Sequence, residues 1–267
     1  VNPRVETVWD GQTCYRDLSS LPGKPDHVVV LVPGAAAIDA IRAAGEAGAR
    51  SATIFSSGFG EGGDPEGLAL GAQLRAAVQE SGLAVSGPNC MGNLASPFGF
   101  CTIPDDRITD FTPGAIGLFG QSGGIVMAIY RALKSRGMTP AYAITNGNEV
   151  GLTTADYIRY MVAQDHVKVI CCFIEAIRDA DDFLSACAEA FAARKPIVAM
   201  KIGGSEASRA AALAHTGSLA GSLACFDAVT QPLGVLRVDT PLAATLACAF
   251  ALGFELFENF LHIYVSG

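Results

Sequence analysis

The chain has 267 residues, of which 50% are hydrophobic and 16% charged, with a mean hydropathy of +0.35. This length suits two domains of ordinary size, and the composition excludes a disordered or fibrous chain. Lys and Arg number 18 against 26 Asp and Glu, which gives a net charge of −8. Because the few basic residues are scattered, a general nucleic-acid or anionic-membrane surface is not expected, and any bound phosphate must be held by local groups.

The eight cysteines show neither a CxxC pair nor a Cys/His cluster at zinc spacing. They are typical of free thiols in a reducing compartment, so we expect a cytoplasmic protein. The longest uncharged apolar run, residues 242–254, is shorter than the roughly 20 residues that cross a bilayer. The N-terminus has no apolar signal region and does not begin with Met, so we expect no export, no membrane span and a fragment of a longer protein.

Short β-branched runs alternate with longer Ala-rich stretches, which predicts an α/β fold with parallel sheets and crossover helices. In the first part, strands are predicted at 27–32, 51–55 and 83–87, and helices at 35–47 and 66–81. A polar stretch with several prolines, 96–114, then breaks the pattern. We place a domain boundary there, near residue 112.

The second part repeats the alternation. The predicted strands and helices are, in chain order, 115–120, 123–136, 141–145, 153–164, 167–175, 180–193, 196–201, 218–230 and 234–238, with a closing helix from Pro241. The first part has about three predicted strands where a nucleotide-binding fold has five or more. We therefore expect the first domain to lack an N-terminal strand and helix.

The sequence GQSGG at 120–124 joins a predicted strand to a predicted helix through small residues. Bare amides and a hydroxyl at a helix N-terminus form an anion site, which the macrodipole strengthens by about half a positive charge. The same residues match G-x-S-x-G, the nucleophile elbow of α/β-hydrolases, with Ser122 as nucleophile, Asp156 or Asp182 as acid and His215 as base. A tight turn that lets the helix pack on the sheet is the third interpretation. The phosphate site is the one we favour.

His215 lies within AHTGSLAG, just before a predicted helix and beside small residues that let another group approach. A neutral imidazole is a competent nucleophile when its other ring nitrogen is held in one tautomer. Glu175 ends the strand 167–175, which is hydrophobic on both faces. A carboxylate at the carboxyl end of a parallel strand can orient an imidazole, whereas the alternatives are a surface histidine and a solvated rim carboxylate.

The sequence GPNCMG at 87–92 follows another predicted strand, and its Pro-Asn pair predicts a turn at the same sheet edge. Cys90 is a candidate nucleophile, but the sequence offers no neighbouring base. A small, closely packed residue is therefore the favoured interpretation. Cys171 and Cys172 are predicted to lie in the core.

These motifs, in this order, resemble the α subunit of succinyl-CoA synthetase and, more closely, the NDP-forming (ADP-forming) acyl-CoA synthetases. The resemblance runs to about residue 250 and rests on GPNCMG, GQSGG, TNGNEVGL, FIE, PIVAMKIGGSEASRAAALAHTGSLAG and GVLRVDT. It implies two Rossmann- or flavodoxin-like domains. These are a CoA-binding domain at 1–111, incomplete at its N-terminus, and a CoA-ligase domain at 112–250, followed by a tail or linker at 251–267.

By this resemblance His215 is the histidine that becomes phosphorylated, and Glu175 is the residue that orients it. The helix N-terminus that receives the phosphohistidine corresponds to Ser122, Gly123 and Gly124. The residues implied to line the CoA site are Val32, Pro33, Ser56, Ser57, Gly58, Asn89 and Cys90.

The implied reaction converts a carboxylic acid, CoA and ATP to acyl-CoA, ADP and phosphate, reversibly, through an acyl phosphate and phosphorylated His215. An ATP-grasp module, absent from these residues, would supply the ATP/ADP and Mg²⁺ chemistry, so we expect a partner module, an oligomer and a fragment that is inactive alone. No metal ligands are predicted in the chain itself. The alternatives are an α/β serine hydrolase using Ser122 and His215, and a non-catalytic CoA-binding module.

Overall fold

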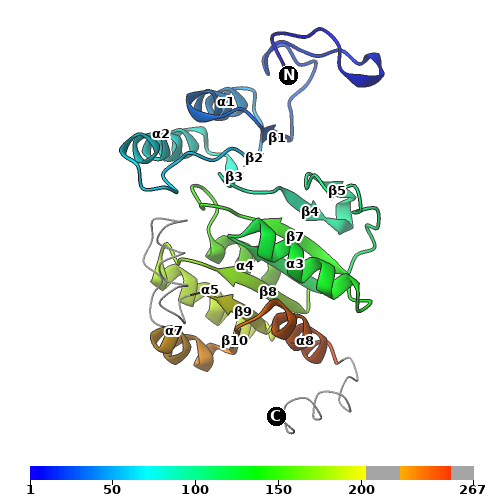
Figure 1. The fold of residues 1–267 in the computed structure, drawn as a ribbon, viewed down its shortest axis with the longest axis vertical. Coiled ribbons are helices and arrows are strands. Elements are labelled where there is room, and N and C mark those ends of the chain that lie inside the picture. The colour runs from blue at the N-terminus through cyan, green and yellow to red at the C-terminus, as the bar shows by residue number, and fades with distance from the viewer. Residues whose placement is uncertain (203–222, 254–267) are drawn as a thin grey trace. The chain divides into compact units, whose positions relative to one another are not determined.

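The computed structural model describes residues 1–202 and 223–253 and divides into two compact units (Figure 1). The N-terminal unit comprises Val1–Cys90 and Asn148–Leu152, and the C-terminal unit comprises Met91–Gly147 and the chain from Thr153 onward. The predicted α/β class with parallel sheets is confirmed. Residues 91–111, predicted to belong to the first domain, contribute strands to the sheet of the C-terminal unit.

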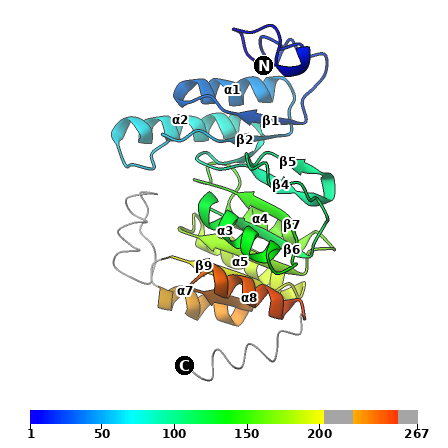
Figure 2. The same cartoon turned by 45° about the vertical axis from the view of Figure 1, so that its right-hand side comes forward.

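The N-terminal unit is a three-stranded parallel sheet with two helices. Its elements are η1 (Trp9–Gly11), β1 (His27–Val30), α1 (Gly34–Glu46), β2 (Ser51–Ile54), α2 (Pro65–Ser81) and β3 (Ala84–Ser86). The strand order is β1-β2-β3, so both crossovers run in the same direction. Right-handed crossovers in one direction place their helices on one face, and α1 packs against α2 there (Figure 2).

Local sequence signals explain where these helices begin and end. Asp64 caps α2 by accepting a hydrogen bond from the amide of Gly67 at 2.7 Å, and Pro65 occupies the first turn. Gly82 ends the helix in the left-handed conformation. The buried face of each helix joins the strands in one core, formed by Val30, Ala37, Ile38, Ile41, Ala44, Ala52, Ile54, Phe59, Leu74, Ala77, Val78, Leu83 and Val85.

The segment Asn148–Leu152 completes this unit although it lies far along the chain. Its backbone amides donate to the end of β3 and the turn that follows, with Leu152 bonded to Val85 at 2.9 Å and Val150 to Gly87 at 3.1 Å. Main-chain pairing therefore holds a later part of the sequence against the GPNC turn.

The C-terminal unit is built on a seven-stranded sheet. Its elements are β4 (Asn93–Ala95), η2 (Ser96–Phe98), β5 (Phe100–Cys101), β6 (Ile116–Gly120), α3 (Gly123–Lys134), β7 (Pro140–Thr145), α4 (Thr154–Val162), β8 (Val169–Ile174), α5 (Ala180–Ala192), β9 (Ile197–Lys201), α7 (Leu223–Thr230), η3 (Gln231–Leu233), β10 (Val235–Val238) and α8 (Pro241–Ala251). The strand order is β10-β9-β8-β6-β7-β4-β5, in which β6 to β10 are parallel. Along these five strands the order is that of a flavodoxin-like fold.

Helices cover both faces of this sheet. The helix α3 packs against α8, while α4 packs against α5, and Figures 1 and 2 show the two pairs on opposite sides. Every residue of β6, β7 and β8 is buried, which explains why their sequences are apolar throughout rather than alternating. The chain runs from β6 to β7 on one side and returns to β8 on the other, so the strand order reverses between β6 and β8.

The polar stretch 96–114, predicted to break the pattern between domains, includes the short strand β5. The two strands β4 and β5 pair antiparallel and extend the sheet beyond β7. Sequence patterning missed them because strands of two or three residues contain too few positions to show an alternation.

All eight cysteines are free, as predicted, and Cys171 and Cys172 are fully buried in β8. Among the residues that the structure describes, no helix has the length and apolar character needed to cross a membrane.

A comparison of two glycines tests the packing of the GPNC turn. Gly87 has φ +98°, and a Cβ added to it would lie 2.4 Å from the Ile54 carbonyl oxygen, whereas Gly82 has φ +65° and nothing within 4 Å of such an atom. We expect Gly82→Ala to cost about 1 kcal/mol for its backbone conformation. Gly87→Ala should cost roughly 1–3 kcal/mol more because the carbonyl must move. Equal midpoints of the two variants in urea unfolding would contradict this packing.

Candidate functional site

Polar side chains gather at the carboxyl ends of four neighbouring strands of the C-terminal unit. In strand order they are Lys201 at the end of β9, Glu175 after β8, Gln121 after β6 and Asn146 after β7. Lys201, Glu175 and Asn146 are buried. Ligands of open α/β sheets bind at this edge, where the strand order reverses, so the fold itself places Gln121 and Glu175 at the candidate site.

The side chain of Gln121 fixes the main chain that follows β8. Its Oε1 accepts hydrogen bonds from the amides of Glu175 at 2.6 Å and Ala176 at 2.9 Å, and its Nε2 donates to the Ala176 carbonyl at 2.7 Å. The backbone N–H of Gln121 donates to the carbonyl of Phe173 at 3.2 Å. Four hydrogen bonds thus join the two strands at the reversal and hold the backbone of Glu175 in place.

Lys201 holds the same backbone from the other side. Its Nζ donates to the carbonyl oxygens of Glu175 at 2.7 Å and Ile202 at 2.9 Å, and the residue is only 6% exposed. Burial lowers the pKa of Lys201 from 10.5 to about 8, while the charge of Glu175 opposes this shift. The ammonium is therefore still protonated at pH 7, with a positive charge that is incompletely compensated.

The N-terminus of α3 is an open, uncapped helix end at this edge. Ser122 is the N-cap residue, and its hydroxyl makes no capping hydrogen bond. A Cβ on Gly123 would lie 2.5 Å from the Met91 side chain, so Met91 would have to shift for a larger residue here. A Cβ on Gly124 would meet nothing within 4 Å. The first turn of α3 can thus admit an anion close to its backbone amides, and the phosphate site stays a prediction.

The two acids considered for a hydrolase triad have structural roles instead. Asp156 accepts hydrogen bonds from the amide and hydroxyl of Thr153 at 2.8 and 2.9 Å and so caps α4. Asp182 forms an ion pair with Arg159 at 2.8 Å near the start of α5. Both carboxylates are already engaged, which removes support from the nucleophile-elbow interpretation of Ser122.

His215 lies outside the described residues, so its role stays a prediction. Sequence reasoning identified Glu175 but missed Gln121, Asn146 and Lys201. Lys201 could have been found, because it ends an apolar strand with a charged residue in the same way as Glu175 does. Gln121 occupies the unspecified position of G-x-S-x-G, and nothing in the sequence shows that its side chain spans two strands.

In the N-terminal unit, the residues predicted to line a CoA site follow the three parallel strands. Val32 and Pro33 come after β1, and the segment 56–58 comes after β2. Asn89 and Cys90 come after β3, where the Asn89 amide donates to the Ser56 carbonyl at 2.9 Å and the Cys90 thiol to the Ile54 carbonyl at 3.2 Å. The turns after β2 and β3 are thereby brought together. The buried thiol of Cys90 agrees with a packing role.

Glu61 is a further polar residue of the loop after β2. Its Oε2 accepts hydrogen bonds from the amides of Gly58 at 2.9 Å and Phe59 at 2.8 Å, and its Oε1 accepts one from Asn148 Nδ2 at 2.6 Å. Asn148 Oδ1 in turn accepts a hydrogen bond from Asn89 Nδ2 at 3.4 Å. One carboxylate therefore ties the loop after β2 to the turn after β3.

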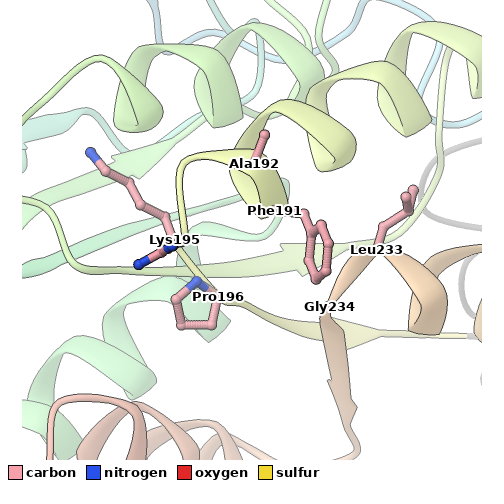
Figure 3. Close-up of a pocket in the computed structure, with 7 residues that line it drawn as sticks. Phe191, Ala192, Lys195, Pro196, Leu233 and Gly234 are labelled. Carbon is pink, nitrogen blue, oxygen red and sulfur yellow. The ribbon is translucent and has the colours of Figure 1, made fainter.

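A groove of about 540 Å³ lies at the opposite, amino end of β9 (Figure 3). Phe191 faces the start of β10 there, where a Cβ on Gly234 would lie 2.8 Å from its ring. Lys195 borders the groove, but its Nζ donates to three carbonyl oxygens at 2.7 to 3.2 Å, those of Met161, Val162 and Gln164. All three ammonium hydrogens are thus used on the end of α4, and this lysine serves structure.

Comparison with known families gives one match for each of the two units. The family described as "Succinyl-CoA ligase like flavodoxin domain" matches residues 113–251. The chain belongs to this family. A second family, described as "CoA binding domain", matches residues 1–95. Together with the relatives described next, these matches confirm the resemblance to NDP-forming acyl-CoA synthetases.

Similar proteins include a trans-feruloyl-CoA synthase of an unknown prokaryotic organism, 31% identical over 90% of this chain and 34% of the relative. The α subunit of an ADP-forming acetate–CoA ligase II of Pyrococcus furiosus is 32% identical over 90% of this chain and 51% of its own length. Among solved structures, a dinucleotide-forming acetyl-coenzyme A synthetase 1 of Ca. Korarchaeum cryptofilum, in complex with phosphate and ADP, superposes with a TM-score of 0.83 at 27% identity. That match covers 92% of this chain and 52% of that chain. The chain thus spans about a third to a half of the length of the proteins that it matches.

Replacing Gln121 tests the clamp on β8. Gln121→Leu removes three side-chain hydrogen bonds, each with a net contribution of about 1 kcal/mol, so we expect a loss of stability of roughly 2–3 kcal/mol. The amides of Glu175 and Ala176 should exchange with deuterium faster, while that of Cys171 in the middle of β8 changes less. Gln73→Leu, on the exposed surface of α2, is the control. Unchanged exchange at Glu175 in Gln121→Leu would refute the clamp.

A second prediction concerns the protonation of Lys201. NMR titration of lysine ¹³Cε signals should show one lysine with a pKa of about 8, missing from Lys201→Met. Between about pH 8 and 10.5 the Lys201 side chain is largely protonated in the unfolded chain and largely neutral in the folded one. The unfolded chain therefore binds more protons, so the free energy of unfolding rises with pH over that range. The rise should be absent in Lys201→Met. A Lys201 signal that titrates near 10.5 would contradict the burial of its charge.

Proposed function

We propose that this chain is the CoA-binding and phosphoryl-carrying part of an NDP-forming acyl-CoA synthetase. The reaction converts a carboxylic acid, CoA and ATP to acyl-CoA, ADP and phosphate, reversibly. The main support is the buried Glu175, held at the strand reversal beside the open N-terminus of α3, in a chain of the succinyl-CoA ligase-like family. Membership of this family gives the carboxylate and the helix end a joint purpose, which is to hold a phosphoryl group and its carrier.

The N-terminal unit has features that suit CoA as a substrate. Leu31 is 70% exposed and Val32 43% exposed just beyond β1, which offers apolar surface to an organic ligand. Pro33 precedes α1 without a side-chain cap, so the helix start can face a phosphate. The hydroxyl of Ser56 is buried and has no partner among the described residues, which leaves a hydrogen-bonding group for the ligand. Ser57, Gly58 and Asn89 would complete the site on adjoining turns.

The proposed reaction has three reversible steps, taken in the direction that consumes acyl-CoA and forms the nucleoside triphosphate. A phosphate oxygen attacks the thioester carbonyl of acyl-CoA, the C–S bond breaks, and acyl phosphate and the CoA thiolate result. A ring nitrogen of His215 then attacks the phosphorus, and the bond to the carboxylate oxygen breaks, which releases the carboxylic acid as its anion. Finally a terminal oxygen of the nucleoside diphosphate takes the phosphoryl group and restores neutral His215.

Glu175 and the N-terminus of α3 each have a role in this scheme. Glu175 accepts the N–H of the His215 ring, which fixes the tautomer and stabilises the cationic phosphohistidine. Ser122 and the amides of Gly123 and Gly124 bind the phosphoryl oxygens at the positive end of the α3 dipole. Phosphoryl transfer needs mainly positioning and charge stabilisation, so these groups suffice without a basic patch.

The nucleotide step requires a module with an ATP-grasp fold, which would bind ATP/ADP with Mg²⁺. This module would be a partner subunit or another part of the same protein, as is consistent with a relative named as an α subunit. We propose an oligomeric assembly in the cytoplasm. The acids named in the relatives, acetate and ferulate, differ in size and polarity, so the substrate is assigned only as a carboxylic acid.

Phosphorylation of His215 is the direct test. The chain is incubated with acetyl phosphate or benzoyl phosphate, alone and in its assembled enzyme, and its intact mass is measured. We expect an acid-labile gain of about 80 Da, one phosphoryl group, that maps to His215 and is absent in His215→Asn. In Glu175→Gln the rate should fall by roughly 10²-fold or more, because the ring loses its oriented tautomer.

Two results would overturn the proposal. Covalent labelling of Ser122 by a fluorophosphonate would favour the serine hydrolase. Tight CoA binding without phosphorylation in the assembled enzyme would favour a non-catalytic CoA-binding module.

A further inference from the structure

A second pocket of the C-terminal unit, of about 300 Å³, lies between α5 and α7. Ala176 and Lys201 border it, so it begins at the ends of β8 and β9. Its walls are mainly apolar. The principal lining side chains are Ile177, Phe183, Leu184, Phe226, Val229 and Lys201.

Lys201 is the one strongly polar group among the described lining residues. Thr230 Oγ1 donates to the carbonyl of Phe226 at 2.7 Å, and Cys225 offers only a weakly polar thiol. Lys201 uses two of its three ammonium hydrogens on the carbonyls of Glu175 and Ile202. Within the part of the chain that the structure describes, one donor and a buried positive charge therefore remain for a ligand in the pocket.

The charge balance favours an anion in this pocket. Among the described residues, Glu175 is the acid whose charge acts on Lys201. Its attraction does not outweigh the cost of burial, since the pKa of Lys201 stays below its ordinary value. A carboxylate placed on the ammonium would supply the missing compensation. It would form a charge-assisted hydrogen bond in surroundings of low polarity, where such bonds are strong.

The shape and walls restrict the ligand further. The rings of Phe183 and Phe226 lie 6.1 Å apart between centroids, and both side chains are buried, so the two rings pack together in the apolar wall. A phosphate dianion needs several donors and would lose its hydration against these walls. A volume of about 300 Å³ is at the lower limit of ligand sites, which suits a small organic acid rather than a nucleotide.

We propose that this pocket binds a small carboxylic acid with an aromatic or branched aliphatic body, with its carboxylate on Lys201 and its body between α5 and α7. The proposal rests on the pocket alone and does not require phosphorylation of His215. It also explains a lysine buried at the sheet edge with one donor left over.

The test is titration of the 267-residue chain with benzoate, followed by calorimetry and saturation-transfer NMR. We expect a Kd of roughly 0.1–1 mM for a ligand of this size. Benzamide, which has the same shape without the charge, should bind at least about tenfold more weakly. Absence of benzoate binding at about 10 mM, or equal binding of benzamide, would overturn the proposal whether or not His215 is phosphorylated.

Three variants locate the binding. Lys201→Met should weaken benzoate binding at least about tenfold. Val229→Trp should fill the pocket from a half-exposed position and block binding while Lys201 is kept. This variant still tests the pocket if Lys201→Met fails to fold. Lys195→Met is the matched control, because Lys195 also binds carbonyl oxygens at an end of β9 but has no free donor. Full benzoate affinity in Val229→Trp, or an equal loss in Lys195→Met, would place the ligand elsewhere.

Discussion

The reversal of strand order between β6 and β8 is the constraint on which the C-terminal unit depends. Because the chain leaves β6 toward β7 and later returns to its other side, α3 and α4 must cover opposite faces of the sheet. The backbone after β8 then extends beyond the strand pairing that the structure describes. Its amides and carbonyls need other partners, and the side chains of Gln121 and Lys201 provide them. Glu175 is fixed as a consequence of satisfying this main chain.

The N-terminal unit solves a similar problem with a carboxylate. The loop after β2 and the turn after β3 lie beyond the strand pairing of β1, β2 and β3. Glu61 accepts hydrogen bonds from two amides of the first loop and from Asn148, whose segment pairs with the turn. In both units, therefore, residues next to the proposed ligand groups serve to order backbone. Such ordering keeps donors and acceptors aimed before a ligand arrives, which lowers the cost of binding.

Much of this architecture could be predicted from the sequence, because long apolar runs and amphipathic helices have a strong pattern. The strand 167–175 was expected to be buried on both faces, and β8 is buried at every position. The strands β4 and β5 were missed because they are short, and their pairing with β7 depends on tertiary contacts. The residues 91–111 accordingly lie in the C-terminal unit, although turn residues predicted a boundary near 112.

The candidate site was predictable only where chemistry and strand position coincide. Glu175 and GQSGG were found because a charged residue and a glycine-rich turn follow buried strands. The bonds from Gln121 were not, since a glutamine's partner depends on which strand lies beside it, and β6 and β8 are separated in sequence by β7. Hydrogen bonds between β6 and the chain after β8 thus depend on the order of the strands in the sheet, which composition and periodicity do not predict.

Two lysines at opposite ends of β9, Lys195 just before the strand and Lys201 at its end, have different surroundings. Lys195 comes just before the strand and uses all its donors on the end of α4, as a helix C-terminus favours. Lys201 ends the strand, reaches only two carbonyls and is much more deeply buried. Retaining a charge that is both buried and underused costs stability, and a ligand would offset that cost. Lysine thus stabilises the amino end of the sheet, whereas at the carboxyl end it holds a buried positive charge that an anionic ligand would neutralise.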